Sequence, residues 1–85
     1  DFNLKSQPNP FSKSTTIQYT LKEAGDVTLS IRNLDGQLVQ VLVDQFQGAG
    51  VHRARFDGQN LSAGVYYAQI RTKTKISTTK IMLMK

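Results

Sequence analysis

The side chains that could perform catalysis are few and widely separated in this 85-residue chain. There is no cysteine, which excludes disulfides, thiolate metal sites and cysteine nucleophiles. His52 is the single histidine, and none of the serines lies in a nucleophile-elbow setting. No glycine-rich loop precedes a helical segment, as a phosphate-binding loop would. We therefore expect no enzyme activity and no cofactor.

The carboxylates give little support to a metal site. Asp26, Asp35 and Asp57 lie in predicted turns, where Asp is favoured because it hydrogen-bonds to the local backbone. A calcium ion held by Asp57 and Asn60 is conceivable, but these oxygen ligands are too few and too unspecifically spaced. His52 lies on the apolar face of a predicted strand with no apparent partner, so we interpret it as a half-buried packing residue. We predict no metal site.

The net charge is +5, and the basic residues are spread along the chain. The densest group runs from Arg71 to Lys80, and Arg53 and Arg55 could lie near it. A nucleic-acid surface needs cations gathered on one face, with aromatic side chains that stack on bases. We interpret the cations instead as solvated strand faces and protected sheet edges, and we expect no nucleic-acid partner.

The length allows one domain, residues 1–85, with a thin core. No apolar run approaches the roughly 20 residues that a membrane-spanning helix needs. The sequence has neither a start methionine nor a signal-peptide pattern. We therefore expect a fragment cut from the end of a longer chain, in which residues 1–7 are a linker or an edge strand.

Alternating apolar and polar residues, separated by turn signals every 8–12 positions, predict about seven short strands and no helix. Without crossover helices the pairing should be antiparallel. The predicted fold class is all-β, an immunoglobulin-like antiparallel β-sandwich. Which side chains of residues 37–43 face the core stays open, because two alternating apolar patterns compete in this strand. We expect one sheet to hold residues 4–7, 15–21 and 50–57, and the other to hold 26–33, 37–43, 64–72 and 75–84.

The strand that follows Gly64 is expected to be central. Tyr66, Ala68 and Ile70 alternate toward one face, and Leu61 precedes them across a glycine turn. This pattern is typical of a tyrosine corner, in which the ring fills the core and the phenol hydrogen-bonds back to the loop. The predicted core consists of Phe11, Ile17, Tyr19, Leu21, Val27, Leu29, Ile31, Val39, Phe56, Leu61, Tyr66, Ala68 and Ile70.

The chain contains an ordered series of short motifs, which are Pro8-Asn9-Pro10-Phe11, Ser14 to Tyr19, Gly25 to Leu29, Leu34 to Gln37, Phe56-Asp57-Gly58, Leu61 to Tyr67, and Lys80 to Lys85. This series resembles the type A C-terminal sorting domain of the type IX (Por) secretion system. The resemblance covers residues 8–85. Phe56 stands where that family usually has Trp, and Gln7 stands where an aromatic residue often precedes the first proline.

The resemblance implies a non-catalytic C-terminal secretion signal. It would direct a periplasmic cargo, joined ahead of it in the same chain, through the outer-membrane type IX translocon to the cell surface or medium of a Gram-negative bacterium. The implied partners are translocon and shuttle components. The apolar residues of the C-terminal strand could in addition allow weak self-association through that strand. If that strand is an edge, Ile81 to Met84 could offer apolar side chains and a strand-pairing site. The implied signal residues are Gly64, Val65, Tyr66, Lys80, Ile81, Met82, Leu83, Met84 and Lys85.

Packing is a competing explanation for these residues, above all for Gly64 and Tyr66. The alternative function is an accessory β-sandwich module that binds polysaccharide or spaces a catalytic domain. It would need an exposed aromatic platform, for which Tyr67 with Phe46 is the candidate. A structural module similar to those of flagellar hook-capping proteins is a third possibility.

Overall fold

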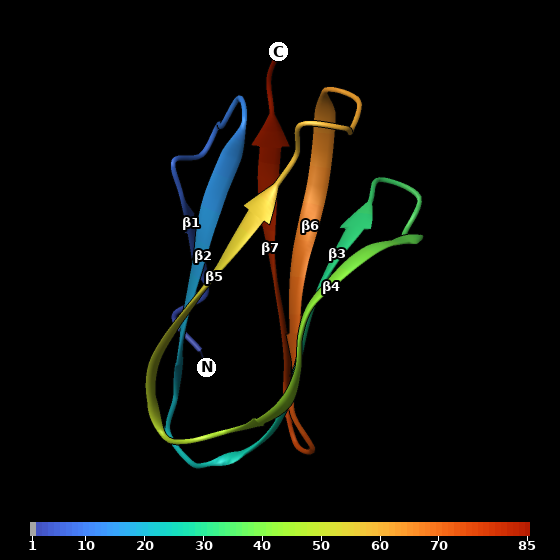
Figure 1. Cartoon of the computed structure of the whole chain (residues 1–85). Coiled ribbons are helices and arrows are strands. Elements are labelled where there is room, and N and C mark those ends of the chain that lie inside the picture. Colours follow the sequence, from blue (N-terminus) through green and yellow to red (C-terminus); the bar gives the residue numbers. More distant parts are fainter. Residues whose placement is uncertain (1) are drawn as a thin grey trace.

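Seven β-strands form the chain in the computed structural model, which describes residues 2–85 (Figure 1). This part of the chain contains no helix, and so none that could cross a membrane. The predicted all-β class is confirmed. The predicted ranges match the strands to within one residue at each end, except that β4 continues four residues beyond the predicted end at residue 43. The strands are β1 (Lys5–Gln7), β2 (Ser14–Leu21), β3 (Gly25–Asn33), β4 (Leu38–Gln47), β5 (Gly50–Asp57), β6 (Gly64–Arg71) and β7 (Ile76–Leu83).

The strands pack as two antiparallel sheets in the predicted grouping. One sheet has the order β1-β2-β5, and the other has the order β4-β3-β6-β7. In immunoglobulin-like sandwiches strands A, B and E share one sheet, and strands C, F and G share the other. Here β1, β2 and β5 correspond to the first set, and β3, β6 and β7 to the second. The β4 strand extends the second sheet beside β3, and then curves over to β5 in the first sheet (Figure 1).

Two register shifts in β4 explain why the sequence did not show which of its side chains face the core. Between Leu29 and Ser30 the partner on β4 changes from Val43 to Val41, and a second shift follows between Ile31 and Arg32. Each shift inserts one extra residue and re-aims the side chains around it, as β-bulges do. Both competing alternations are therefore partly right, because Val39, Leu42 and Val43 all pack partly buried against the core.

The core fills the space between the sheets and has an aromatic cluster at one end. Phe56 lies there with its ring centroid 5.8 Å from that of Phe11 and 6.4 Å from that of Tyr66, both edge-to-face. Eleven of the thirteen predicted core residues are buried. Val39, on a bulged edge strand, and Leu61, in a turn, are only half-buried, so the prediction was wrong for these two. The core also contains Phe2, Ile81 and Leu83, which the prediction omitted.

Tyr19 and His52 are cross-strand neighbours on β2 and β5, and Tyr19 also contacts the end of β4 in the other sheet. The Tyr19 hydroxyl donates a hydrogen bond to the side-chain carbonyl of Gln47. Burial raises the pKa of the Tyr19 phenol, and the hydrogen bond to Gln47 offsets part of that rise. The His52 ring stacks on Tyr19 with centroids 5.6 Å apart, and its Nε2 lies 2.7 Å from the Gly48 carbonyl oxygen. The half-buried packing role predicted for His52 is confirmed.

Candidate recognition surface on the C-terminal hairpin

The two segments implied as a signal are direct neighbours in the structure. The β6–β7 register places Gly64 opposite Leu83, Val65 opposite Met82, and Tyr66 opposite Ile81. Both segments therefore lie at the end of the sandwich from which the C-terminus leaves (Figure 1). Antiparallel pairing brings into contact residues that the sequence separates by a whole hairpin.

Tyr66 anchors this end of the sandwich as the tyrosine corner predicts. Its ring is only 8% exposed, and its hydroxyl donates a hydrogen bond of 2.7 Å to the Ser62 carbonyl oxygen. Gly64, between them, has a φ of 151°, a conformation that residues with a Cβ rarely adopt. The turn and the ring thus fix where β6 begins, and with it the position of β7.

The terminal segment divides its side chains between the core and the surface. Ile81 and Leu83 are 0% and 1% exposed, whereas Met84 is 53% exposed. The expectation that Ile81 to Met84 all offer apolar side chains is therefore wrong for Ile81 and Leu83. The period of two in a strand turns these two residues inward. The outer face carries the exposed Lys80 and the half-buried Met82.

Residues 9–11 already cover the end of the β7 edge. The Phe11 N–H donates to the Met82 carbonyl at 2.9 Å, and the Met84 N–H donates to the Phe11 carbonyl at 2.8 Å. The Asn9 side chain donates to the Lys80 carbonyl and accepts from the Met82 N–H, both at 3.0 Å. β7 is the edge strand of its sheet, but the strand-pairing site considered at Ile81–Met84 is already occupied by the chain's own residues.

Lys85 and Gly58 fasten the C-terminal end of the sandwich to the turn before β6. The Lys85 ammonium donates to the carbonyl oxygens of Gln59, at 2.8 Å, and of Leu61. Asp57 is engaged in the same turn, where its carboxylate accepts the Gln59 N–H at 3.0 Å. No group of three or more acidic or histidine side chains capable of holding a metal occurs within residues 2–85.

Substitution of Gly58 by Ala is expected to destabilise the domain by about 1–3 kcal/mol. A Cβ at this position would lie 3.0 Å from Leu83 Cδ2 and 3.1 Å from Phe11 Cε2, within the packed core. Gly48→Ala is the matched control, because nothing lies within 4 Å of a Cβ there. Urea unfolding of both variants measures the difference. Equal stability of the two variants would show that the contact with Leu83 and Phe11 relaxes without cost.

The net charge of the protein lies entirely in its C-terminal part. Residues 1–60 contain six basic and six acidic side chains, whereas residues 61–85 contain five basic and no acidic ones. Sequence reasoning noted the density between Arg71 and Lys80 but treated it as ordinary surface. A count of charge by segment would have separated this hairpin from the neutral remainder. The hairpin is thus suited to acidic partners.

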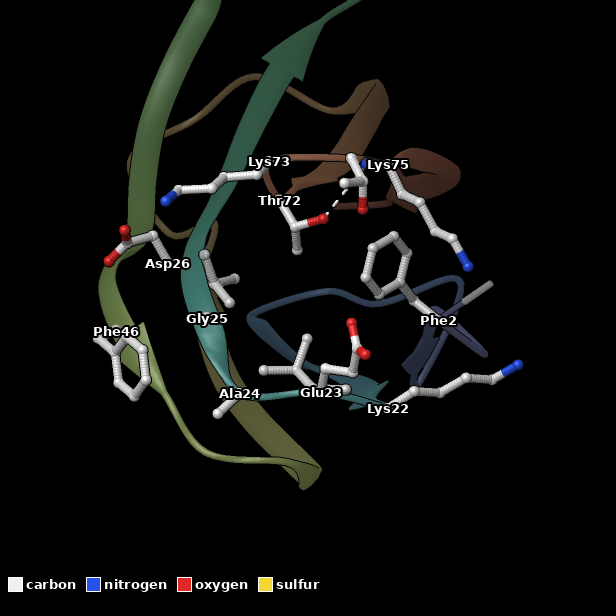
Figure 2. A pocket seen from close by; sticks show the side chains of 13 residues that line it. Phe2, Lys22, Glu23, Ala24, Gly25, Asp26, Phe46, Thr72, Lys73 and Lys75 are labelled. Carbon is white, nitrogen blue, oxygen red and sulfur yellow. Dashed lines mark hydrogen bonds between the residues drawn. The ribbon is translucent and has the colours of Figure 1, made fainter.

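A hollow of about 360 Å³ lies at the opposite end of the sandwich, between the β2–β3 and β6–β7 turns (Figure 2). Phe2 and Glu23 project into it, and Lys73 and Asp26 lie at its rim. Phe46 also borders the hollow and is 65% exposed. The charges at this rim have both signs, and they supply no constellation for catalysis.

The proposed aromatic platform does not form. Phe46 pairs with Asp26 on β3, whereas Tyr67 pairs with Arg32 on the same strand. Six residues of extended strand separate these positions, which is about 20 Å. The expectation that Tyr67 and Phe46 act together on a polysaccharide is therefore wrong.

The topology and the tyrosine corner define a small immunoglobulin-like β-sandwich whose net charge lies in residues 61–85, which include its last hairpin. A family model described as the secretion system C-terminal sorting domain matches residues 6–84. The chain belongs to this family, as the resemblance predicted, and it is therefore a C-terminal sorting signal of type IX secretion. Such domains imply export to the cell surface or the medium. No curated protein matches the chain.

Proposed function

We propose that this domain directs a periplasmic cargo, joined ahead of it in one polypeptide, through the outer-membrane type IX translocon. The domain itself performs no catalysis, and residues 1–85 act as one unit of a longer secreted protein. The family match over residues 6–84 supports this assignment. The observation that carries the mechanism is the register of β6 and β7, which joins both implied signal segments in one surface.

The implied signal residues have two roles in this proposal. Tyr66, Ile81 and Leu83 are buried and hold the hairpin in place. Gly64, Lys80, Met84 and Lys85 are exposed, and Val65 and Met82 are half-buried on the outer face. The translocon or shuttle component contacts this exposed set, which consists of Gly64, Val65, Lys80, Met82, Met84 and Lys85.

The double variant Lys80→Ser and Met84→Ser is expected to lose most export while keeping its fold. Both side chains are exposed, so each change should alter stability by less than about 0.5 kcal/mol. The assay fuses residues 1–85 behind a periplasm-targeted reporter in a host with the translocon, and it measures reporter at the surface and in the medium. The matched control is Lys5→Ser with Val51→Ser, which removes one exposed cation and one exposed apolar side chain from the other sheet.

Export of the two double variants at the same level would contradict the assignment of the recognition surface to the hairpin. Retention of the unmodified fusion in the periplasm would contradict the sorting role itself. Circular dichroism of both purified variants shows whether a loss of export reflects a loss of fold.

A further inference from the structure

The first half of the β7 edge offers backbone groups for pairing. Along an edge strand, alternate residues direct both their N–H and C=O groups away from the neighbouring strand. Lys80, Met82 and Met84 use such groups on Asn9 and Phe11. By the same alternation Ile76, Thr78 and the N–H of Lys80 point to the free side. Within the described residues, no strand other than β6 pairs with β7.

This half of the edge is also accessible. An open hollow beside it is lined by Phe2, Thr74, Lys75, Ile76 and Ser77. Ile76 itself is 57% exposed, and Thr78, the next residue on the same face of the strand, is also exposed. This hollow gives a partner's side chain access to the exposed Ile76.

The other edges carry features that discourage strand addition. The β4 edge is interrupted by two bulges, and β1 has only three residues. The β5 edge bears the exposed cations Arg53 and Arg55 within the strand. Bulges, short length and charged residues on the edge are the usual protections of natural sheets. The stretch Ile76–Thr79 has none of these devices, although the cations Lys73, Lys75 and Lys80 flank it.

The positive charges of these lysines determine which kind of partner can pair with this edge of β7. A second copy of this chain would bring another hairpin with five positive and no negative side chains, so the two edges would repel each other. An extended segment with acidic side chains would instead pair its backbone with the edge and its charges with the flanking lysines. We propose that the edge from Ile76 to Lys80 binds an acidic extended segment of a partner by strand addition. The identity of that partner as part of the secretion machinery rests on the proposed function.

The test uses the purified 85-residue chain and a fluorescently labelled, end-capped peptide of alternating valine and glutamate residues. Fluorescence anisotropy should detect binding that weakens as salt rises from about 0.05 M to about 0.5 M, because exposed charges are then screened. Amide hydrogen exchange should show new protection at residues 76, 78 and 80. A valine–lysine peptide of the same length should not bind.

Two pairs of variants separate strand pairing from charge. Thr78→Pro removes an outward N–H that β6 does not use, and it should abolish binding while the fold is kept. Its control is Val51→Pro, at the corresponding outward position of β5, which should bind like the unmodified chain. Lys73→Gln, Lys75→Gln and Lys80→Gln together should weaken binding about tenfold. Their control replaces Lys5, Arg53 and Arg55 by Gln, which removes the same charge and should have little effect on peptide binding.

Several results would overturn the proposal. These are equal binding of the lysine peptide, an equal loss in the control variants, or protection of residues 76–80 that rises with protein concentration alone. The last result would identify a second copy as the occupant. Peptide binding is measured without any export, so its failure leaves the sorting role untouched. Full export of a Thr78→Pro fusion would overturn the assignment of this edge to the sorting partner.

Discussion

A chain that ends at Thr79 is expected to lose cooperative folding altogether. The deletion of Lys80–Lys85 removes Ile81 and Leu83, which are 0% and 1% exposed. Truncation of a buried aliphatic side chain to Ala alone costs about 2–5 kcal/mol. Here two such side chains are lost together with the backbone bonds to Phe11. A domain of this length has a free energy of unfolding of only about 4–13 kcal/mol.

Urea unfolding followed by circular dichroism measures this effect. The control is removal of Lys85 alone, which breaks only exposed hydrogen bonds to the turn and should leave a cooperative transition. A cooperative transition of the longer truncation at nearly the unmodified midpoint would show that the end of β7 is peripheral. The prediction also bears on export assays. If a terminal deletion abolishes export, the loss of recognition cannot be separated from the loss of folding. The double variant Lys80→Ser with Met84→Ser avoids this problem, because it changes only exposed side chains.

Replacement of Tyr66 by Ala is expected to cost about 3–5 kcal/mol of unfolding free energy. The ring is nearly buried against Phe56, and its removal leaves a cavity at the end of the core. Tyr66→Phe keeps the ring and removes only the hydrogen bond to Ser62, so it should cost about 1 kcal/mol. The two variants together separate the ring from the hydroxyl in chemical denaturation.

Tyr67→Ala is the internal control for Tyr66→Ala, because the neighbouring ring is only half-buried on the outer face. Its cost should be clearly the smaller of the two. A cost below about 1 kcal/mol for Tyr66→Ala would mean that the corner does not depend on the ring.

Much of the architecture could be predicted because it depends on local patterns. The alternation in residues 27–32 and 66–70 and the turn residues between strands specify which side chains face inward. The tyrosine corner was predictable because Leu61, Gly64 and Tyr66 lie within one turn and one strand. The grouping of strands into sheets followed from the immunoglobulin-like order.

The features that were missed depend on contacts across the whole chain. The register shifts of β4 arise from its pairing with β3, so the phase of residues 37–43 could not be read from their own alternation. The cover over β7 joins Asn9 to Lys80 and Met82, which are 71 and 73 positions away. A run that is apolar on both faces, such as Ile81 to Met84, does not reveal which residues point inward.

The pairing of Asn9 and Phe11 with β7 has a consequence for the order of events during synthesis. The ribosome delivers the amino end of the domain first and β7 last, so Phe11 waits for its partners Met82 and Met84 until the domain is fully translated. Closure of the sandwich therefore requires that translation has passed Met84. A polypeptide that stops before β7 leaves the backbone groups of Phe11 without these partners.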